Sequence, residues 1–304
     1  MSSRVMRSGE GVLFLTGGSN DVLQLFSAAG FARAVDLAAW HDRLAARDAL
    51  FAERGIPWRL LLAPEKLSVL GQSVLGPDAM PPAQRFLQAL PHPAVIDPAG
   101  YLRDQHAAGY SVYPATDSHW TSIGAFSAFQ WLMADMGVAL DYSAYAACAP
   151  LPMHYHGDLW DAAHADLPPD LFERRVPPAS LHRIHANTLV QFKERHGREN
   201  DMRLHTGSHV VYRNEAAQNP GRLLLFGSSF SDHRAECSLL TFAAALFFRE
   251  VHFIWSTSLD IATIDRVEPD LVLVEMPERF LPLCPCDDLD IEAYAAARLA
   301  HWQD

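Results

Sequence analysis

The sequence contains little cysteine. Its 304 residues include only Cys148, Cys237, Cys284 and Cys286. Such low cysteine use in a large chain argues against a fold that depends on disulfides. Cys284 and Cys286 are too close for an ordinary structural disulfide, and they lack the second cysteine pair that a zinc site would need. We therefore expect reduced thiols.

Basic residues are also scarce. Lysine and arginine number 24 against 36 aspartates and glutamates, which gives a formal net charge of −12. A negatively charged chain without a basic run is poorly suited to the phosphate backbone, so no nucleic-acid partner is expected. Hydrophobic residues make up 49% of the chain and charged residues 20%, which indicates a globular protein with a substantial core.

The N-terminal region lacks a long hydrophobic run. The apolar stretch that follows the polar first residues, Gly11–Thr16, is too short for a signal-peptide core or a membrane span. As written, the chain is expected to be cytoplasmic and to have no membrane-spanning segment. A chain trimmed of an export signal would look the same, and the periplasm would then be the expected compartment.

Short apolar runs alternate with helical patterns along the chain. The runs are typical of strands that are buried on both faces, as in parallel sheets. The expected strands are Val12–Leu15, Trp58–Ala63, Val210–Tyr212, Leu223–Phe226, Val251–Trp255 and Leu271–Glu275. The expected helices are Phe31–Arg54, Thr121–Met136 and His233–Phe248. This alternation predicts a three-layer αβα sandwich around a mainly parallel sheet.

The segment from Cys148 to about His209 differs from its flanks. It is rich in His, Asp, Pro and Arg, and its apolar residues follow no clear period. We interpret it as an irregular insertion, at about 148–209, over one edge of the sheet. A single domain that spans residues 1–304 is expected to contain it.

The stretch Tyr113–Thr121 carries the acid and base of a possible serine mechanism. Asp117 stands two residues before His119, and Trp120 follows directly, where it is placed to shield the pair from water. An acid at this spacing can orient the imidazole and leave its Nε2 atom for a nucleophile. The alternative is that Asp117 caps the entry to a helix and His119 is a structural histidine.

The stretch Leu224–Ser231 supplies the candidate nucleophile. An apolar strand is expected to end at Gly227, which permits a sharp turn, and a helix is expected to begin near Asp232. Free backbone amides at that helix start would favour an oxyanion beside Ser229. The competing serines are Ser228, Ser229 and Ser231. The position after the strand and the glycine favours Ser229, although serines that merely cap the helix are the alternative. The stretch does not fit the Gly-x-Ser-x-Gly elbow of α/β-hydrolases.

Together these motifs resemble the SGNH-hydrolase-like domain of the alginate O-acetyltransferase family of bacterial exopolysaccharide modification. Thr116–Trp120 resembles that family's Asp-x-His-Trp motif, and Gly227–Ser231 resembles its Gly-x-Ser block, with Ser228 where many relatives have Asp. The smaller blocks that agree are Gly11–Leu15, Ser19–Val22, Ala63–Lys66, Gly157–Leu159, Leu271–Glu275 and Glu278–Phe280. The resemblance covers the chain from about Gly11 to Leu281.

The resemblance implies an SGNH-like fold with a permuted motif order, because the acid–base pair precedes the nucleophile. It implies that Ser229 is the nucleophile, His119 the base and Asp117 the orienting acid. The implied activity is carbohydrate O-acetylation through an acyl-enzyme, without a cofactor. The implied partners are an acetyl donor, either a small molecule or an acyl-carrying protein, a saccharide or exopolysaccharide precursor as acceptor, and the polysaccharide-biosynthesis machinery.

Two other activities stay open for the same fold. Water in place of the sugar would make the protein a carbohydrate acetylesterase. A non-catalytic saccharide-binding subunit is the alternative from a different functional class.

Arg279 and Trp120 are further candidates for the oxyanion or substrate site. Arg279 follows an expected strand and would lie at the carboxyl edge of the sheet, where α/β proteins bind ligands. It could bind a substrate hydroxyl or carboxylate, or it could pair with Glu275 or Glu278.

Two other pairs of residues suggest chemistry different from that of the Asp117 and His119 pair. His154 and His156 can share one face of a strand, as in a metal-dependent hydrolase, but no third ligand is convincingly spaced, so no metal site is expected. Asp232 and His233 follow the serine block as a possible second dyad. The expected helix start favours a capping role for Asp232.

Overall fold

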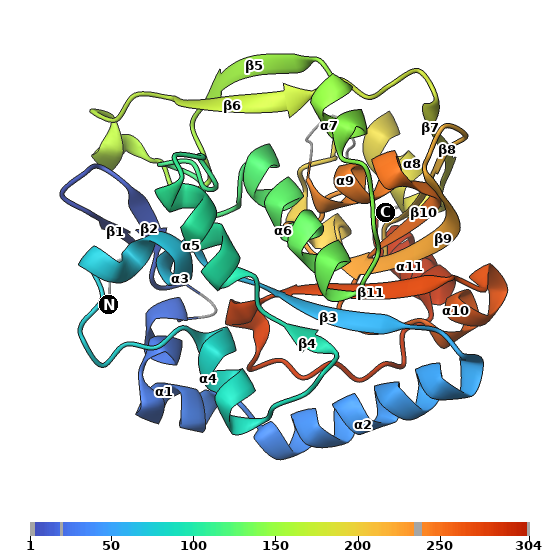
Figure 1. The fold of residues 1–304 in the computed structure, drawn as a ribbon, viewed down its shortest axis with the longest axis horizontal. Helices are drawn as coiled ribbons and strands as arrows, with labels where there is room; N and C mark the ends of the chain where they lie inside the picture. Colours follow the sequence, from blue (N-terminus) through green and yellow to red (C-terminus); the bar gives the residue numbers. More distant parts are fainter. Residues whose placement is uncertain (1–3, 19–20, 234–238, 303–304) are drawn as a thin grey trace.

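The structure of the protein, a computed structural model, describes residues 4–18, 21–233 and 239–302. A central sheet lies between two layers of helices (Figure 1). Helix α2 (Leu37–Arg54) runs along one face of the sheet, and α6 (Ser122–Asp135) covers the other. The predicted three-layer α/β fold with a mainly parallel sheet is confirmed.

The elements of the described chain have the following bounds. The strands are β1 (Val5–Arg7), β2 (Leu13–Leu15), β3 (Trp58–Ala63), β4 (Val95–Ile96), β5 (Pro150–Tyr155), β6 (Asp170–Arg175), β7 (Leu181–Ala186), β8 (His209–Asn214), β9 (Asn219–Gly227), β10 (Phe248–Trp255) and β11 (Leu271–Pro277). The other helices are α1 (Ala28–Ala34), α3 (Lys66–Leu70), α4 (Pro82–Ala89), α5 (Ala99–Ala107), α7 (Ser143–Ala147), α8 (Thr188–Arg195), α9 (Leu240–Phe247), α10 (Ile261–Val267) and α11 (Ile291–Ala300).

The central sheet of the described residues has the strand order β4-β3-β11-β9-β10-β8-β7. The first five strands in this order are parallel to one another, whereas β8 and β7 are antiparallel additions at one edge. Strand β9 lies in the middle, between β11 and β10. Its carboxyl end is therefore flanked by the ends of two parallel neighbours, which is where open α/β sheets place their ligands.

Two of the expected strands do not join a parallel sheet. Val12–Leu15 contributes β2, which pairs with β1 in an antiparallel two-stranded sheet. The apolar run is explained by a small separate core, in which Phe14 packs with Val22, Phe26 and Leu67. Val210–Tyr212 lies within β8, which belongs to the central sheet but runs antiparallel to β10. An apolar run reports burial on both faces, and it carries no information about strand direction.

Two of the expected helices have different bounds. The pattern in Phe31–Arg54 is split into α1 and α2, because the Asp36 side chain accepts hydrogen bonds from the backbone N–H groups of Ala38 and Ala39 and starts a new helix. The helix expected at His233–Phe248 begins at Leu240, and Phe248 already belongs to β10. Residues 234–238 of that segment lie outside the described residues. Thr121–Met136 matches α6, with Thr121 as its N-cap.

The segment expected as an insertion adds structure around one edge of the sheet. Strands β5 and β6 form an antiparallel ribbon that lies above α6 in Figure 1. Strand β7 then joins the edge of the central sheet beside β8, and α8 follows it.

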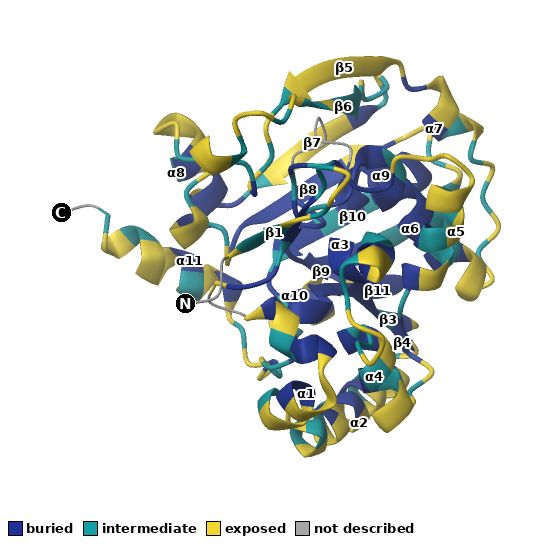
Figure 2. Cartoon of the chain, turned by 90° about the vertical axis from the view of Figure 1, so that its left-hand side faces the viewer, coloured by how far each residue is buried: buried dark blue, intermediate teal, exposed yellow. Residues whose placement is uncertain are grey.

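The core is divided between the two faces of the sheet. Along β9, Leu223 and Leu225 pack into the cluster beneath α6 and α9, whereas Leu224 and Phe226 pack into the cluster beneath α1 and α2. This is the alternation that a strand with period two produces. Figure 2 shows the central strands as the buried interior, strand β5 as largely exposed and strand β6 as mostly of intermediate burial.

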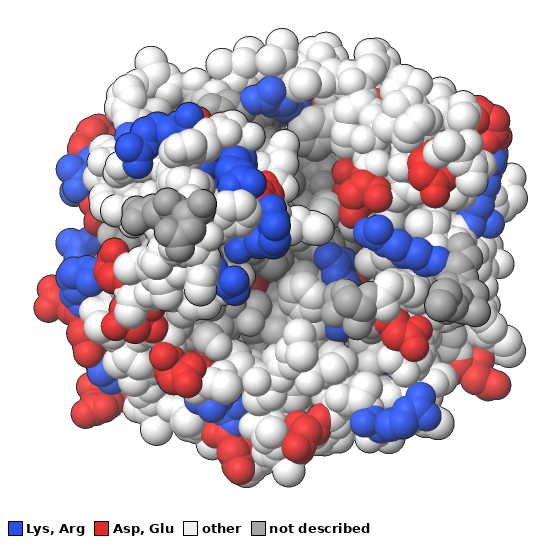
Figure 3. Space-filling view, turned by 180° about the vertical axis from the view of Figure 1, so that it is seen from behind, with Lys and Arg blue, Asp and Glu red and all other residues white. Residues whose placement is uncertain are grey.

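The surface carries both signs of charge. Seen from behind, acidic and basic side chains are interspersed on the same face (Figure 3). Within the described residues, no helix combines the length and the hydrophobicity needed to cross a bilayer.

Candidate active site

The turn after β9 is held by a buried carboxylate from the neighbouring strand β11. Glu275 accepts hydrogen bonds from the backbone N–H of Ser228 at 2.8 Å, from the Ser228 hydroxyl at 2.9 Å and from the Ser231 hydroxyl at 2.7 Å. The turn closes with a hydrogen bond from Ser231 N–H to the Ser228 carbonyl at 3.1 Å. Two of the three competing serines are therefore bonded to Glu275, and Ser229 lies between them.

Ser229 faces the acid–base pair. Its Oγ lies 2.8 Å from Nε2 of His119, and Nδ1 of the same ring lies 2.8 Å from Oδ1 of Asp117. The same carboxylate oxygen accepts the backbone N–H of His119 at 2.8 Å, so the acid fixes both the ring and its backbone. The fold thus brings His119 into contact with a serine that lies 110 positions further along the chain.

The electrostatics of the pair favour an ionised acid and a basic imidazole. Burial alone would raise the pKa of Asp117, but the hydrogen bonds and charge of His119 outweigh it, and the pKa lies below its usual range. Burial alone would lower the pKa of His119, yet the hydrogen bond and the charge of Asp117 outweigh burial and raise that pKa. An imidazole held in this way can take a proton from Ser229 while Asp117 stabilises the resulting cation.

The loop that carries Asp117 and His119 is fixed by charged side chains. Asp170 accepts hydrogen bonds from the backbone N–H groups of Ala115, at 2.7 Å, and Thr116, at 2.8 Å. Lys66 donates to the carbonyl oxygens of Pro114, at 2.8 Å, and Ala115, at 3.1 Å. Burial lowers the pKa of Lys66 to about 8. These contacts hold the loop backbone from two sides.

A second turn closes against the same loop. Asp158 accepts hydrogen bonds from the backbone N–H of Ser118 at 2.7 Å and from its hydroxyl at 2.8 Å. Gly157 donates its N–H to the Thr116 hydroxyl at 2.8 Å. A Cβ atom on Gly157 would lie 2.4 Å from the Cα of Asp117, so only glycine permits this approach.

Trp120 and Arg279 both contact Phe230. The indole N–H of Trp120 donates to the Phe230 carbonyl at 2.9 Å, and Trp120 is buried. The Arg279 guanidinium lies 5.3 Å from the centre of the Phe230 ring and is ion-paired with Glu65, at 2.9 and 3.1 Å. The Phe230 ring centre is in turn 5.0 Å from that of His119. Both candidates therefore support the walls of the site through contacts with protein atoms.

The two glutamates considered as partners of Arg279 have other contacts. Glu275 holds the serine turn. Glu278 accepts the backbone N–H groups of Glu65 and Ala83, each at 2.8 Å, and the hydroxyl of Ser68. Burial raises the pKa of Glu278 to about 8.

The remaining candidate histidines lie apart from the triad geometry. His154 is exposed on β5, and His156 stacks on Trp160 with ring centres 4.1 Å apart. Among the described residues, the set whose ligand atoms converge within 4.8 Å of one another is Asp117, His119 and Asp158, which contains neither histidine.

Asp232 and His233 are not themselves helical, and residues 234–238, which follow them, lie outside the described part of the chain. Residues 231–233 contain a turn and a bend, and Nδ1 of His233 lies 3.4 Å from Oδ1 of Asp232. Both side chains are buried. The histidine within hydrogen-bonding distance of the Ser229 hydroxyl is His119.

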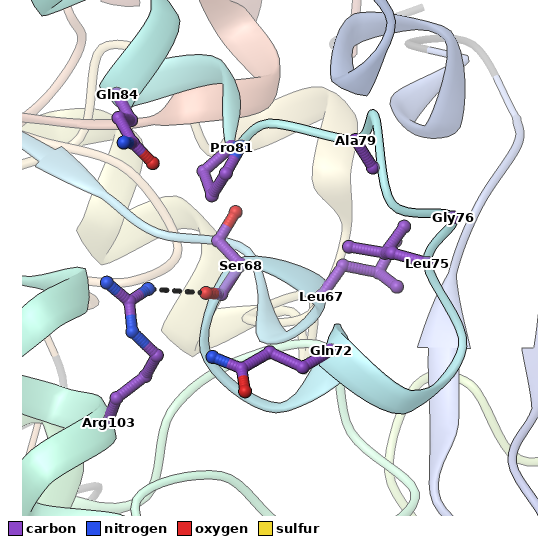
Figure 4. Close-up of a pocket in the computed structure, with 9 residues that line it drawn as sticks. All are labelled: Leu67, Ser68, Gln72, Leu75, Gly76, Ala79, Pro81, Gln84 and Arg103. Carbon is purple, nitrogen blue, oxygen red and sulfur yellow. Dashed lines mark hydrogen bonds between the residues drawn. The ribbon is translucent and has the colours of Figure 1, made fainter.

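A cavity of about 310 Å³ lies beside α3 and is separate from the candidate triad (Figure 4). Arg103 and Ser68 line it, and the Arg103 guanidinium donates to the Ser68 carbonyl at 2.9 Å. Because no residue of the candidate triad lines this cavity, it is not the place where Ser229 would meet an acyl group.

Several supporting residues were not identified from the sequence. The roles of Glu65, Lys66, Asp158 and Glu275 emerge only when the strand ends and loops are brought together. All four lie in the short blocks on which the family resemblance rests, which is the signal that could have marked them.

Comparisons with known proteins identify the fold. No protein-family model matches the chain, and the search of curated proteins finds no match. Among solved structures, Bacillus cereus PatB1 with a sulfonyl adduct is similar at 16% identity and a TM-score of 0.60, over 91% of this chain and 95% of that one. The O-acetyltransferase domain of Pseudomonas putida AlgJ is similar at 18% identity and a TM-score of 0.55, over 97% and 99%.

A third solved structure has a similar fold. A DHHW family protein from Eubacterium siraeum is similar at 14% identity and a TM-score of 0.57, over 92% of this chain and 94% of that one. Identities this low establish the fold and leave the chemistry to the site itself. The protein therefore has the fold shared by PatB1 and the O-acetyltransferase domain of AlgJ, as the SGNH-like resemblance predicted.

Proposed function

We propose that the protein is a carbohydrate O-acetyltransferase that acts through Ser229, His119 and Asp117. The observation that carries the proposal is the 2.8 Å separation between His119 Nε2 and Ser229 Oγ, with Asp117 bonded behind the imidazole. This is the arrangement of an activated serine nucleophile. The fold shared with an O-acetyltransferase domain supports acetyl as the group that is transferred.

The first half-reaction forms an acyl-enzyme. Ser229 Oγ attacks the carbonyl carbon of the acetyl donor while His119 Nε2 takes the hydroxyl proton. The tetrahedral intermediate then breaks its bond to the donor's leaving group, and His119 returns the proton to that group. Asp117 stays ionised and stabilises the imidazolium.

The second half-reaction transfers the acetyl group to a sugar. A hydroxyl of a saccharide or exopolysaccharide precursor gives its proton to His119 and attacks the acyl carbon. Ser229 then leaves and recovers the proton. Water in place of the sugar gives acetate, so exclusion of water decides between transferase and esterase.

A serine-directed covalent probe tests the nucleophile. The purified protein is treated with a fluorophosphonate, digested, and the modified peptide is identified by mass spectrometry. We expect the label on Ser229, its loss in Ser229→Ala, and its retention in Ser228→Ala, because the Ser228 hydroxyl faces Glu275.

Acetyl release and transfer test the reaction. Release of acetyl from p-nitrophenyl acetate should fall by roughly three orders of magnitude or more in Ser229→Ala, because the members of a triad act as a unit. Unchanged release of acetyl in that variant would contradict the proposed enzymatic activity and favour a saccharide-binding subunit. The ratio of acetylated saccharide to free acetate then separates a transferase from an esterase.

A further inference from the structure

Three histidines gather on neighbouring strands at the β7 edge of the sheet. His185 on β7 pairs with Val211 on β8, and Val211 pairs with His252 on β10. His209 lies two positions from Val211 on β8. Because side chains alternate along a strand, His185, His209 and His252 all point to one face of the sheet.

This face is opposite the one that supports the candidate triad. Val210 and Phe253, the neighbours of His209 and His252 in sequence, pack into the core cluster that also contains Trp120 and Phe230. The histidines alternate with them and so point to the other side of the sheet. They form a group outside the proposed acetylation site.

The spacing of two of these rings suits a shared metal ion. Nε2 of His209 lies 3.2 Å from Nδ1 of His252. Two nitrogens bound at ~2.0–2.1 Å to one tetrahedral zinc ion would lie roughly 3.3 Å apart. The ring centre of His209 is 5.4 Å from that of His252 and 5.5 Å from that of His185, against roughly 5 Å for histidines that share such an ion.

Glu250 fixes the orientation of His252. Its carboxylate lies 3.0 Å from Nε2 of His252, so that nitrogen carries the proton and Nδ1 presents a lone pair toward His209. A carboxylate behind a histidine is the usual second partner of a metal-bound imidazole. Glu250 also pairs with Arg213, at 2.5 Å, and Arg222, at 3.3 Å, which hold it in place.

His209 contains a buried polar atom that needs an explanation. Its Nδ1 is buried and has no hydrogen-bond partner among the described residues, and the whole residue is only 4% exposed. Such atoms are rare. Nδ1 and Nε2 point away from different sides of the ring, so an ion bound to Nε2 would not contact Nδ1. If a cation takes the position of the proton between His209 and His252, Nδ1 is the atom that can accept that proton.

His185 completes the set from the outside. It is exposed, so its ring can turn. Its ring has to turn before the three histidines can share one ion. Their ligand atoms do not yet lie within 4.8 Å of one another, since among the described residues only the cluster of Asp117, His119 and Asp158 meets that distance. We propose that His185, His209 and His252 bind a divalent transition-metal cation that prefers imidazole ligands, such as Zn²⁺, independently of the candidate triad.

Calorimetric titration of the chelator-treated full chain with ZnCl₂ tests this site. We expect one saturable site per chain. Substitution of the exposed ligand in His185→Ala, which does not disturb the core, should weaken binding at least tenfold, and His252→Ala should abolish it. Glu250→Gln should weaken it by about 10–100-fold because the orientation of His252 is lost. The matched control is His182→Ala, an exposed histidine on the same strand, which should bind like the unsubstituted chain.

Two outcomes overturn the proposal. One is the absence of saturable binding by the folded chain. The other is binding that survives His185→Ala and His252→Ala but is lost in Asp158→Asn, because the ion would then occupy the Asp117, His119 and Asp158 cluster. Visible absorption of a Co²⁺ form gives a second readout, since tetrahedral coordination should disappear in His252→Ala. Labelling of Ser229 by the covalent probe should be unchanged in His185→Ala, which keeps this test separate from that of the proposed acetyltransferase.

Discussion

Single side chains with fixed partners define the chemistry at the residue scale. Asp117 contacts one ring nitrogen of His119 and the backbone amide of the same residue, and those contacts set the tautomer and leave the other nitrogen for Ser229. The carboxylate also raises the pKa of the imidazole against the effect of burial.

Asp117→Asn should lower the activity and change its pH dependence. Loss of the charge and of the correct tautomer should lower kcat/KM by roughly 10³–10⁴-fold. The base must be neutral to accept a proton, so activity rises as pH increases through the His119 pKa. Without Asp117, burial lowers that pKa, and the acid limb should move to lower pH.

The pH–rate profile of acetyl release for both proteins measures the shift. The proposed role of Asp117 is wrong if the residual activity of the variant keeps the acid limb of the unsubstituted enzyme. Circular dichroism of the variant should match the original, because the substitution is nearly isosteric.

Glu275 is the second residue whose contacts make a clear prediction. Its carboxylate accepts three donors from Ser228 and Ser231, and burial raises its pKa. Glu275→Gln replaces one acceptor oxygen by a donor, so at least one buried serine donor loses its partner. The free energy of unfolding should fall by about 1–3 kcal/mol, and labelling of Ser229 should slow at least tenfold.

Urea unfolding and the rate of probe labelling measure these two effects. The exposed Glu215→Gln is the matched control and should change neither. Labelling at the normal rate in Glu275→Gln would show that the turn keeps its geometry without the carboxylate.

At the scale of elements, the site is a meeting of strand ends and loops. The turn after β9 presents Ser229, the end of β11 supplies Glu275, and the end of β3 leads into α3 with Lys66. The loop that carries His119 then closes against the turn at Gly157. Each element is ordinary by itself, and the close approach of the two loops is the feature that glycine makes possible.

Gly157→Ala should therefore displace Asp117, the candidate acid, without altering its carboxylate. The added Cβ would lie 2.4 Å from the Asp117 Cα, so one of the two loops has to move. Crowding of this kind costs about 1–3 kcal/mol of stability, and acetyl release should fall because Asp117 is displaced.

Thermal unfolding and acetyl release measure the result. Gly9→Ala is the control, since a Cβ there meets nothing within 4 Å. If Gly157→Ala behaves like Gly9→Ala in both measurements, the close approach of the two loops is not required.

At the scale of the whole molecule, β9 joins the two faces of the protein. Leu225 contributes to the core on one face and Phe226 to the core on the other. We therefore expect a disturbance on either face to affect the strand that leads to Ser229, the candidate nucleophile. We expect the chain to unfold as a single cooperative domain.

Leu225→Ala and Phe226→Ala should both destabilise the same unfolding transition. Each substitution leaves a cavity in a fully buried core and should lower the free energy of unfolding by about 2–5 kcal/mol. Far-ultraviolet circular dichroism and tryptophan fluorescence should report coincident transitions in both variants. Leu283→Ala, at an exposed leucine, is the control. A biphasic transition in one variant would mean that the two faces are separate folding units.

The elements show how far the sequence alone could predict the fold. The apolar runs located β3, β9, β10 and β11, because burial on both faces leaves a continuous hydrophobic signal. The bounds of β3 agree with its run, whereas the other three strands extend beyond theirs. The same signal placed β2 in the wrong sheet and said nothing of the direction of β8. The Asp36 cap divided a helix that the apolar pattern predicted as continuous.

The residues of the candidate site show the same division between what the sequence predicts and what the tertiary structure determines. By itself, the sequence determined the candidate set of Asp117, His119 and Ser229, because an acid two residues before a histidine and a serine after an apolar run and a glycine are both local patterns. Only the tertiary structure decided what each candidate touches. The bonds from the serine turn to Glu275, the pairing of Arg279 with Glu65 and the grouping of His185, His209 and His252 all join residues from separate strands or loops. Contacts of this kind depend on strand order and direction, which local residue patterns do not encode, and they therefore exist only once the sheet has formed.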